Sequence, residues 1–412
     1  MEKRVVITGL GAISPIGNNV DELWDGIKTC KCGIDEITAF DTSTFKTKLA
    51  AEVKGYDPLN YFDAKQAKRL DRVSQFAMIA AREAFKDSEI TEENTDFNRI
   101  GVYMSSGIGG FSTIQTQCHT NFEKGNNRVS PMFIPMGICN MPAGNITIDL
   151  NLKGESLAIV TACASSTHSI GEAYRNIKHG YQDVILAGGT EAAICEAAVA
   201  GFENMKALSS STDKNRASIP FDKERSGFVM GEGAGVVVLE ELEHALKRGA
   251  KIYGEVIGYG ATSDAYHITS PDPEADGAIR AMKAAIDDAK IKPEDIDYIN
   301  AHGTSTHLND STETKAVKGA LGDASSKVKV SSTKGNTGHL LGAAGVIEAI
   351  ICTKAIEDKL LPPTINYQVP DEECDLNVVP NTPVKQEINV AMSNSLGFGG
   401  HNATVIFKKF EK

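Results

Sequence analysis

The sequence predicts an α/β fold made of two similar halves, and two observations support this prediction. First, short apolar runs rich in Val and Ile alternate along the chain with segments that have a helical period. Second, four segments of the first half recur in the second half in the same order. Strands that alternate with helices are typical of α/β proteins, so we expect largely buried strands covered by helices.

The expected elements of the first half follow from these periods. Its strands cover 4–8, 100–104, 157–161, 184–187 and 236–239. Helices are expected near 20–30 and 65–87, and a third helix starts at Ser165. In that third helix one apolar face repeats at i, i+3, i+4 and i+7, and it is formed by Ile170, Ala173, Tyr174 and Ile177.

The second half repeats the first. The similar pairs are 4–17 with 254–267, 99–107 with 297–305, the strand ending at Cys163 with 328–332, and 184–191 with 390–399. Four matches in one order favour duplication over chance. A charged connecting helix is expected at 240–251, so we place the halves at 1–250 and 251–412. Such a duplication brings the loops after the strands to a shared crevice.

Composition and charge disfavour several classes of function. The 412 residues carry a formal net charge of −12, whereas nucleic-acid binding needs a basic face. The chain has no apolar run long enough for a membrane span, and its N-terminal apolar segment is too broken for a secretory signal. The eight cysteines are dispersed, so we expect reduced thiols, no metal site and a cytoplasmic protein.

The candidate reactive residue is Cys163, which stands where the predicted strand at 157–161 gives way to the helix from Ser165. A helix N-terminus favours negative charge, so we expect this thiol to have a lowered pKa and more of the nucleophilic thiolate. Its small neighbours Ala162 and Ala164 leave room for a ligand. A lone cysteine is more often simply buried, so the partners of Cys163 must decide between the two interpretations.

Two of the nine histidines occupy the place in the second half that Cys163 occupies in the first. His302 follows the predicted strand within 297–305, and His339 stands between a glycine-bearing turn and a helix expected at about 340–359. Lys334 lies in the same turn, after a strand that looks buried, which disfavours a surface position. Three other histidines fall on predicted helices and are expected to be structural or solvated: His168, His179 and His244.

A glycine-rich turn at 394–402 joins two predicted strands, 389–392 and 403–407. One interpretation is a plain hairpin turn. The other is a loop whose backbone N–H groups form part of an oxyanion hole, with Phe398 as a mobile aromatic side chain beside it. Each motif alone is a weak signal.

As a set, these motifs resemble the β-ketoacyl-[acyl-carrier-protein] synthases, specifically the elongating type II condensing enzymes of bacterial fatty acid synthesis. The resemblance spans essentially the whole chain and rests on TACASS, PFDKERSGFVMGEGAG, NAHGTST, TGHLLGAAG and GFGG. It implies a thiolase-type fold with duplicated α/β halves in α-β-α-β-α layers, and a homodimer. It also implies that Cys163 takes an acyl chain from an acyl carrier protein. Malonyl carrier protein then condenses with that chain and loses carbon dioxide, without a cofactor.

The resemblance also implies roles for single residues. His302 and His339 would donate hydrogen bonds from Nε2 to the enolate that decarboxylation forms, and Lys334 would orient both imidazoles. The N–H groups of Cys163 and Phe398 would form the oxyanion hole. Ile108 and Phe202 would wall the acyl pocket; Thr269, Ser270, Thr304 and Thr306 would contact the pantetheine arm; and Lys65, Lys68, Arg69 and Lys206 would attract the acidic carrier.

A further role is expected for Glu348, which lies on the helix after His339 and could order a histidine or bind a cation. The chain departs from the family pattern at Gly335-Asn336, His307 and His401. None of these departures falls in the Cys–His–His set. They bear on loop flexibility and carrier-protein recognition.

Three other functions fit parts of the sequence. A non-catalytic partner subunit of a polyketide assembly line would share the fold but lack the nucleophile, and Cys163 argues against it. A thiolase would use coenzyme A and a second cysteine, which is missing near His339 and in 394–402. A ketosynthase for a polyketide or another specialised chain would use the same residues on a different cargo.

Overall fold

The structure is a computed structural model that describes residues 2–411. Its main feature is a ten-stranded sheet in the order β10-β9-β13-β14-β8-β1-β7-β6-β4-β5. The strands of the first half are β1 (Val5–Ile13), β4 (Ile100–Ser105), β5 (Ser156–Leu157), β6 (Val184–Glu191) and β7 (Gly233–Glu241). Those of the second half are β8 (Gly254–Ser263), β9 (Tyr298–Asn300), β10 (Lys329–Ser331), β13 (Val390–Gly397) and β14 (His401–Lys408).

The two ends of this sheet repeat one arrangement. At one end β5, β4 and β6 are parallel, and β7 and β1 follow antiparallel. At the other end β10, β9 and β13 are parallel, and β14 and β8 follow antiparallel. β1 and β8 join the ends through an antiparallel pairing that includes Val5 and Val256. The four pairs of similar segments therefore occupy matching places, as duplication predicts.

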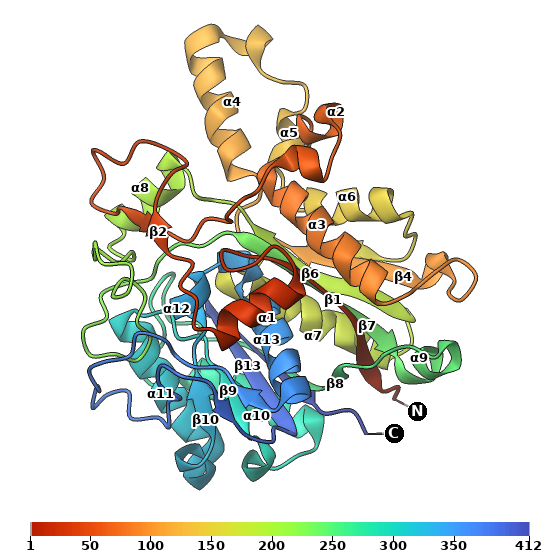
Figure 1. Cartoon of the computed structure of the whole chain (residues 1–412), viewed down its shortest axis with the longest axis vertical. Coiled ribbons are helices and arrows are strands. Elements are labelled where there is room, and N and C mark those ends of the chain that lie inside the picture. The colour runs from red at the N-terminus through yellow and green to blue at the C-terminus, as the bar shows by residue number, and fades with distance from the viewer. Residues whose placement is uncertain (1, 412) are drawn as a thin grey trace.

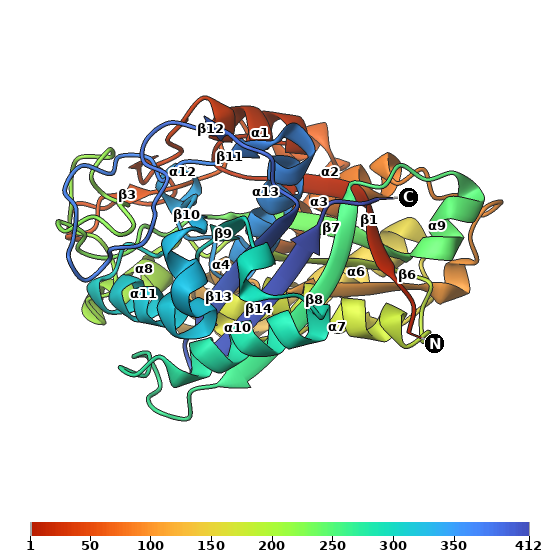
Figure 2. The ribbon, with the colours of Figure 1, turned by 90° about the horizontal axis from the view of Figure 1, so that it is seen from below.

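The helices form layers around the sheet. α7 (Ser165–Lys178) and α13 (Ala344–Asp358) contact strands of both halves and lie between them. α3 (Arg72–Asp87) covers the other face of the first half with α6 (Met141–Leu150) beside it. α10 (Asp276–Ala289) covers the second half, and Figure 2 shows it across β13 and β14 from α13. The predicted α-β-α-β-α layering is therefore confirmed.

The remaining elements decorate this body. Figure 1 shows α4 (Phe111–Lys124) projecting from it, with α2 (Ala64–Ala67) and α5 (Phe133–Gly137) near the base of α4. The other helices are α1 (Val20–Lys28), α8 (Glu196–Asn204), α9 (Leu242–Arg248), α11 (His307–Leu321) and α12 (Lys334–Thr337). Two small sheets pair β2 (Asp35–Glu36) with β3 (Leu49–Ala50) and β11 (Leu360–Leu361) with β12 (Val384–Lys385).

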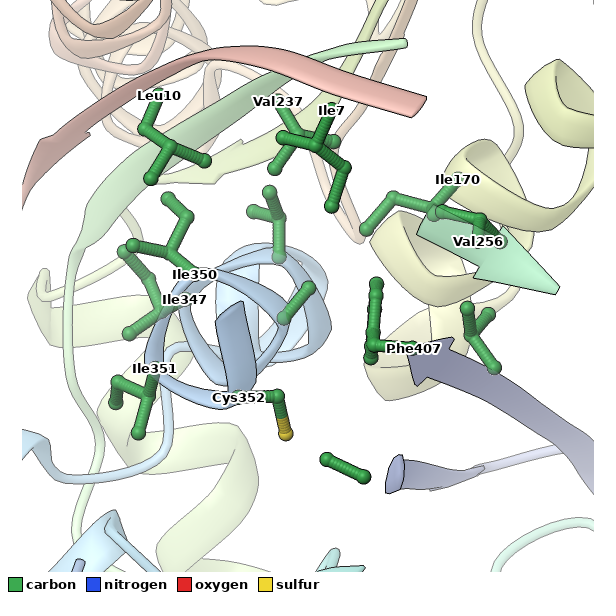
Figure 3. Close-up of a cluster of buried hydrophobic side chains, with 14 of the residues drawn as sticks. Ile7, Leu10, Ile170, Val237, Val256, Ile347, Ile350, Ile351, Cys352 and Phe407 are labelled. Atoms are coloured by element: carbon green, nitrogen blue, oxygen red, sulfur yellow. The ribbon is translucent and has the colours of Figure 1, made fainter. Parts of the chain in front are cut away.

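One hydrophobic cluster joins the two halves around α13. Figure 3 shows Ile347, Ile350 and Ile351 of this helix among apolar side chains from other elements. Those side chains come from both halves and include Ile7, Leu10, Ile170, Val237, Val256 and Phe407. The halves thus share one core, because α13 is apolar on most of its circumference and buries every residue except Lys354, Glu357 and Asp358.

The structure confirms some of the predicted helices and strands and contradicts others. The apolar face predicted for the helix from Ser165 is buried in α7. The buried strand predicted at 157–161 is wrong: only Ser156–Leu157 pairs, at the sheet edge, and both residues are exposed. The helix predicted at 240–251 is shorter, because its first two residues continue β7. Within residues 2–411, none of the helices has the length and apolar character that a membrane span needs.

Candidate active site

A cavity of about 330 Å³ brings the predicted reactive residues together from both halves. Cys163, His302 and His339 all line it. Seven further predicted site residues line the same cavity: Phe398, Phe202, Thr269, Ser270, Thr304, Thr306 and Lys206. The crevice that duplication predicts is therefore present, and the reactive residues reach it from loops that follow strands.

Cys163 lies in a tight turn directly before α7. The 3-10 turn Ala162–Ala164 precedes the helix, and Ala162 has a positive φ of 51°. The backbone N–H groups of Phe398 and of Cys163 itself act on its thiol and lower the thiol pKa. A Cβ on Gly397 would lie 2.6 Å from the carbonyl oxygen of Thr161, so only glycine lets the 394–402 turn approach this closely. That turn is a hairpin between β13 and β14, and it also brings donors to the thiol.

The prediction of a lowered thiol pKa is wrong. Complete burial raises the pKa of Cys163 to about 12 and outweighs the opposing positive charge of Lys334. The negative charge of Glu191 raises it further, and the two N–H groups lower it. A helix N-terminus stabilises a thiolate only where the desolvation cost is smaller than that gain. The resting site therefore holds a neutral thiol.

The two imidazole rings lie edge to face, with centroids 5.3 Å apart and planes at 84°. Burial and the positive charge of Lys334 hold the pKa values of both His302 and His339 well below the usual range of histidine, so both rings are neutral. The Nδ1 atom of each ring is buried without a hydrogen-bond partner. His339 also packs edge-on against the ring of Phe228, at 5.3 Å.

The loop that carries His302 is fixed by a buried carboxylate that sequence reasoning missed. Glu313 on α11 accepts the backbone N–H groups of His302 at 2.8 Å and of Gly303 at 2.7 Å. Burial raises the pKa of Glu313 to about 7. Eleven positions separate Glu313 from His302, and this spacing carries no short-range signal in the sequence.

Lys334 is buried, as predicted, but it does not line the cavity. Its side chain is 2% exposed and pairs with the carboxylate of Glu348. Burial raises the pKa of Glu348 while the ammonium group opposes that shift. The positive charge of Lys334 acts on Cys163, His302 and His339 through space, and it lowers the pKa of all three groups. Lys334 is therefore the electrostatic centre of the site, and Glu348 is its partner.

An apolar cluster lies on one side of the thiol. Ile108 and Phe202 pack against the buried cluster that contains Cys163 and Leu341. The Phe202 ring lies 6.4 Å from that of Phe398 and 5.5 Å from that of Phe228. Ile108 does not itself line the cavity. Leu341 lines it and was missed by sequence reasoning.

Hydroxyl groups and two linked loops line the polar side. Thr304 and Thr306 share a hydrogen bond of 3.0 Å between their hydroxyl groups. The backbone N–H groups of Thr269 and Ser270 donate to Nδ1 of His267, both at 3.1 Å. The 394–402 turn is tied to this loop, because Gly399 donates to the carbonyl of Ile268 at 2.8 Å and Asp264 donates to that of Gly400 at 2.9 Å.

The predicted basic residues are divided between two places. Lys206, after α8, is exposed and lines the cavity. The other three are exposed on and just after α2, outside the cavity lining: Lys65, Lys68 and Arg69. Figure 1 shows α2 and α8 well apart on the molecule. The four residues therefore form no single patch within one chain.

Each departure from the family pattern has a distinct environment. His307 is exposed, begins α11 and lines the cavity. The ring of His401 lies edge-on to His168, which is hydrogen-bonded to the Tyr259 hydroxyl group at 2.6 Å. A Cβ on Gly335 would lie 2.8 Å from Cγ1 of Ile365, and Asn336 donates to the carbonyl of Lys31 at 3.0 Å. The Gly-Asn pair thus packs away from the imidazoles.

Comparison with known proteins gives two family matches and close relatives. Residues 2–245 match the "Beta-ketoacyl synthase, N-terminal domain" and residues 253–368 match the "Beta-ketoacyl synthase, C-terminal domain". The chain is 52% identical over 409 residues to 3-oxoacyl-[acyl-carrier-protein] synthase 2 of Staphylococcus aureus strain N315, covering 99% of each chain. It is 49% identical to the protein of the same name from Synechocystis, covering 100% of this chain and 99% of that one.

Solved structures agree with these relatives. The ishigamide ketosynthase/chain length factor superposes with a TM-score of 0.93 at 36% identity, with both chains fully covered. A type II PKS ketosynthase in complex with its acyl-carrier protein gives 0.92 at 32% identity, also with full coverage. A β-ketoacyl synthase from Burkholderia phymatum gives 0.92 at 34% identity, covering 99% of this chain and 100% of that one.

Proposed function

The chain belongs to the β-ketoacyl synthase family, and we propose that Cys163, His302 and His339 carry out its condensing reaction. It is an acyltransferase of fatty acid elongation that joins an acyl chain to malonyl-[acyl-carrier protein], giving 3-oxoacyl-[acyl-carrier protein] and carbon dioxide. The observation that carries the residue assignment is the meeting of one thiol and two neutral imidazoles in a single buried cavity.

In the first half-reaction Cys163 attacks the thioester of the acyl carrier protein. A new S–C bond forms, the bond to the pantetheine sulfur breaks, and the proton of the Cys163 thiol ends on the departing pantetheine thiol. The exchange leaves no net charge in a dry site, which suits a thiol whose pKa burial has raised. The N–H groups of Cys163 and Phe398 stabilise the oxyanion of the tetrahedral intermediate.

In the second half-reaction malonyl carrier protein loses carbon dioxide, and the electron pair of the broken C–C bond becomes an enolate. His302 and His339 donate hydrogen bonds from Nε2–H to the thioester oxygen. The positive charge of Lys334 opposes protonation of both rings, so each ring stays a neutral hydrogen-bond donor. The carbanion attacks the acyl-Cys163 carbonyl carbon and expels the thiolate, which takes up a proton.

An acyl carrier protein is the partner that such a cavity requires. Its slender pantetheine arm would lie between the hydroxyl groups of Thr304 and Thr306 and the loop of Thr269 and Ser270. Lys206 at the cavity, with Lys65, Lys68 and Arg69 on the surface, would attract its acidic body against the overall charge of −12. The cytoplasmic location expected from the sequence stays a prediction, which cell fractionation would test.

A homodimer is proposed at the free edge of the sheet. β5 is the last strand in the sheet order, and the apolar side chains near it, Leu157 and Val160, are 41% and 48% exposed. An unpaired strand edge with apolar side chains favours pairing with a second copy. Light scattering should give twice the chain mass, and Val160→Asp should reduce it. A monomeric parent chain would exclude the dimer.

Intact-protein mass spectrometry tests the residue assignment directly. Purified chain is mixed with medium-chain acyl carrier protein, and malonyl carrier protein is added afterwards. We expect an acyl-sized mass gain on Cys163 that disappears as 3-oxoacyl carrier protein forms. A gain only with acyl-coenzyme A would indicate thiolase-like or initiating chemistry, and no gain with either donor would remove Cys163 as the nucleophile. Efficient turnover of polyketide intermediates alone would instead favour the specialised-pathway function.

A further inference from the structure

A buried carboxylate in the first half is hydrogen-bonded to two segments that carry residues of the apolar cluster around the thiol. Glu191 ends β6 and is 0% exposed. Its Oε1 accepts the Ser106 hydroxyl group at 2.8 Å and the Ile108 N–H at 3.4 Å. Its Oε2 accepts the Gly107 N–H at 2.8 Å and the Gly342 N–H at 3.0 Å. One side chain thus ties the segment after β4 to the segment before α13.

Two glycines leave the space that the Glu191 carboxylate occupies. A Cβ on Gly107 would lie 2.7 Å from Oε2 of Glu191, and one on Gly342 would lie 2.9 Å from the same atom. A Cβ on Gly342 would also lie 2.4 Å from the nitrogen of Gly107, so the two backbones touch. A larger side chain at either glycine would clash with the carboxylate, so this contact needs Gly107, Gly342 and Glu191 together.

Each of the two tied segments carries one residue of the apolar wall. Ile108 follows Gly107, and Leu341 precedes Gly342 with a positive φ of 48°. Both side chains pack in the cluster that contains Cys163, with Phe202 beside them. The spacing between Ile108 and Leu341 therefore depends on four hydrogen bonds to one carboxylate.

We propose that Glu191 is a positioning residue that sets the range of acyl-chain lengths, by holding Ile108 and Leu341 at a fixed separation beside Cys163. This inference rests on the proposed function, in which the apolar cluster receives the acyl chain. A carboxylate is suited to this role because it accepts four hydrogen bonds and donates none. An amide in its place would turn an N–H group toward a backbone N–H group.

The same carboxylate acts on the thiol through its charge, which gives a second and independent readout. Glu191 raises the pKa of Cys163, Lys334 lowers it, and His302 and His339 face the cavity as neutral rings. Burial raises the pKa of Glu191 to about 7, so it is ionised over the alkaline range in which the thiol titrates. Removing the charge should therefore shift thiol titration to lower pH.

Three variants separate position from charge. Glu191→Gln removes the negative charge and replaces one acceptor oxygen with an NH₂ group, so the four hydrogen bonds can no longer all form. Glu191→Asp keeps the charge but has a side chain shorter by one methylene group. Glu83→Gln is the matched control, because Glu83 also accepts two backbone N–H groups, from Ala12 and Val20, and burial raises its pKa to about 7. Glu83 does not line the cavity.

The experiment measures kcat/KM for a series of acyl carrier proteins from short to long chains, and the pH dependence of iodoacetamide alkylation of Cys163. We expect Glu191→Gln and Glu191→Asp to change the long-to-short ratio about tenfold, the effect of losing one hydrogen bond to a charged group. Only Glu191→Gln should move the alkylation midpoint to lower pH. Glu83→Gln should change neither quantity.

An unchanged chain-length ratio in both Glu191 variants, with both folded by circular dichroism, would overturn the inference. Ile108→Phe distinguishes that failure from failure of the proposed function. Ile108→Phe could shorten the accepted chain while the Glu191 variants leave the long-to-short kcat/KM ratio unchanged. In that case Ile108 contacts the acyl chain, but Glu191 does not position it. If Ile108→Phe leaves the preference unchanged, the placement of the acyl chain is itself wrong.

Discussion

The two halves of the molecule have the same strand arrangement, but in the proposed reaction they supply different groups. The first half supplies a thiol and an apolar cluster to the crevice, and the second half supplies two imidazoles. The second half also holds a buried ammonium group outside the cavity lining. Each half braces its loop with a buried carboxylate that accepts backbone N–H groups, Glu191 in one and Glu313 in the other. The two loops occupy matching places in the repeat, but their carboxylates come from different elements, β6 in the first half and α11 in the second.

The halves also differ in how burial sets their protonation. Burial raises the pKa of an acid and lowers that of a base, so it keeps both the thiol and the imidazoles neutral. The buried Lys334 assists only one half, because its charge favours thiolate but disfavours imidazolium. The resting site is thus suited to exchange of neutral thiols and to hydrogen-bond donation, with the Lys334 ammonium group outside the cavity lining.

Removing the thiol should have the largest effect on the rate of condensation. We expect Cys163→Ala to lower condensation by at least about 10⁴-fold, since loss of a covalent nucleophile has effects of this order or larger. Release of carbon dioxide from malonyl carrier protein should persist, because the second half carries that step. Parallel assays of labelled carbon dioxide and 3-oxoacyl product measure both, and equal loss of the two activities would contradict the division between halves.

Removing an imidazole should have the complementary effect. His339→Ala should slow decarboxylation by about 10²–10³-fold, the usual result of losing one donor to a developing oxyanion. Acylation of Cys163 should still be visible by intact mass, because that step depends on the N–H groups of Cys163 and Phe398. His179→Ala, at an exposed position after α7, is the control and should change neither step. Failure of acylation in His339→Ala would assign this ring to both halves of the reaction.

The charge of Lys334 should affect how the decarboxylation rate of the second half depends on pH. In the parent chain both imidazoles have lowered pKa values, so decarboxylation should not lose rate to histidine protonation as the pH falls through 6.5. Lys334→Ala removes the cation that lowers those values and leaves Glu348 unpaired, so the acidic loss of rate should begin at higher pH. Rates between pH 5.5 and 8 test this, and superimposable profiles would show that Lys334 does not act on the rings.

The sequence predicted that Cys163, His302 and His339 would meet, and the structure places all three in one cavity lining, because local patterns mark them. Cys163, His302 and His339 each stand where a strand-like segment gives way to a glycine-bearing or small-residue turn, and such turns meet at one crevice in a duplicated fold. The internal repeat likewise anticipated the matching ends of the sheet. These features depend on periodicity and order, which are visible in a single chain.

What the sequence could not predict depends on long-range packing. Glu191 and Glu313 look like ordinary charged residues, and their burial is set by segments that are distant along the chain. One signal was present for Glu191, because it directly ends an apolar strand at the same sheet edge as the reactive loops. The sign of the thiol pKa shift was also beyond local reasoning, since the helix N-terminus is visible in the sequence and the extent of desolvation is not.

The smallest expected effect tests whether the halves are one folding unit or two, at 1–250 and 251–412. Ile170→Val on α7 and Ile351→Val on α13 each remove one buried methylene group from the shared cluster, at a cost of about 1 kcal/mol each. Because that cluster draws on strands of both halves, either variant should lower the midpoint of a single denaturation transition that circular dichroism and tryptophan fluorescence report alike. The one tryptophan, Trp24, lies in the first half. If Ile351→Val shifted only the circular-dichroism transition and left the fluorescence transition in place, the halves would unfold separately and the boundary near residue 250 would separate two true domains.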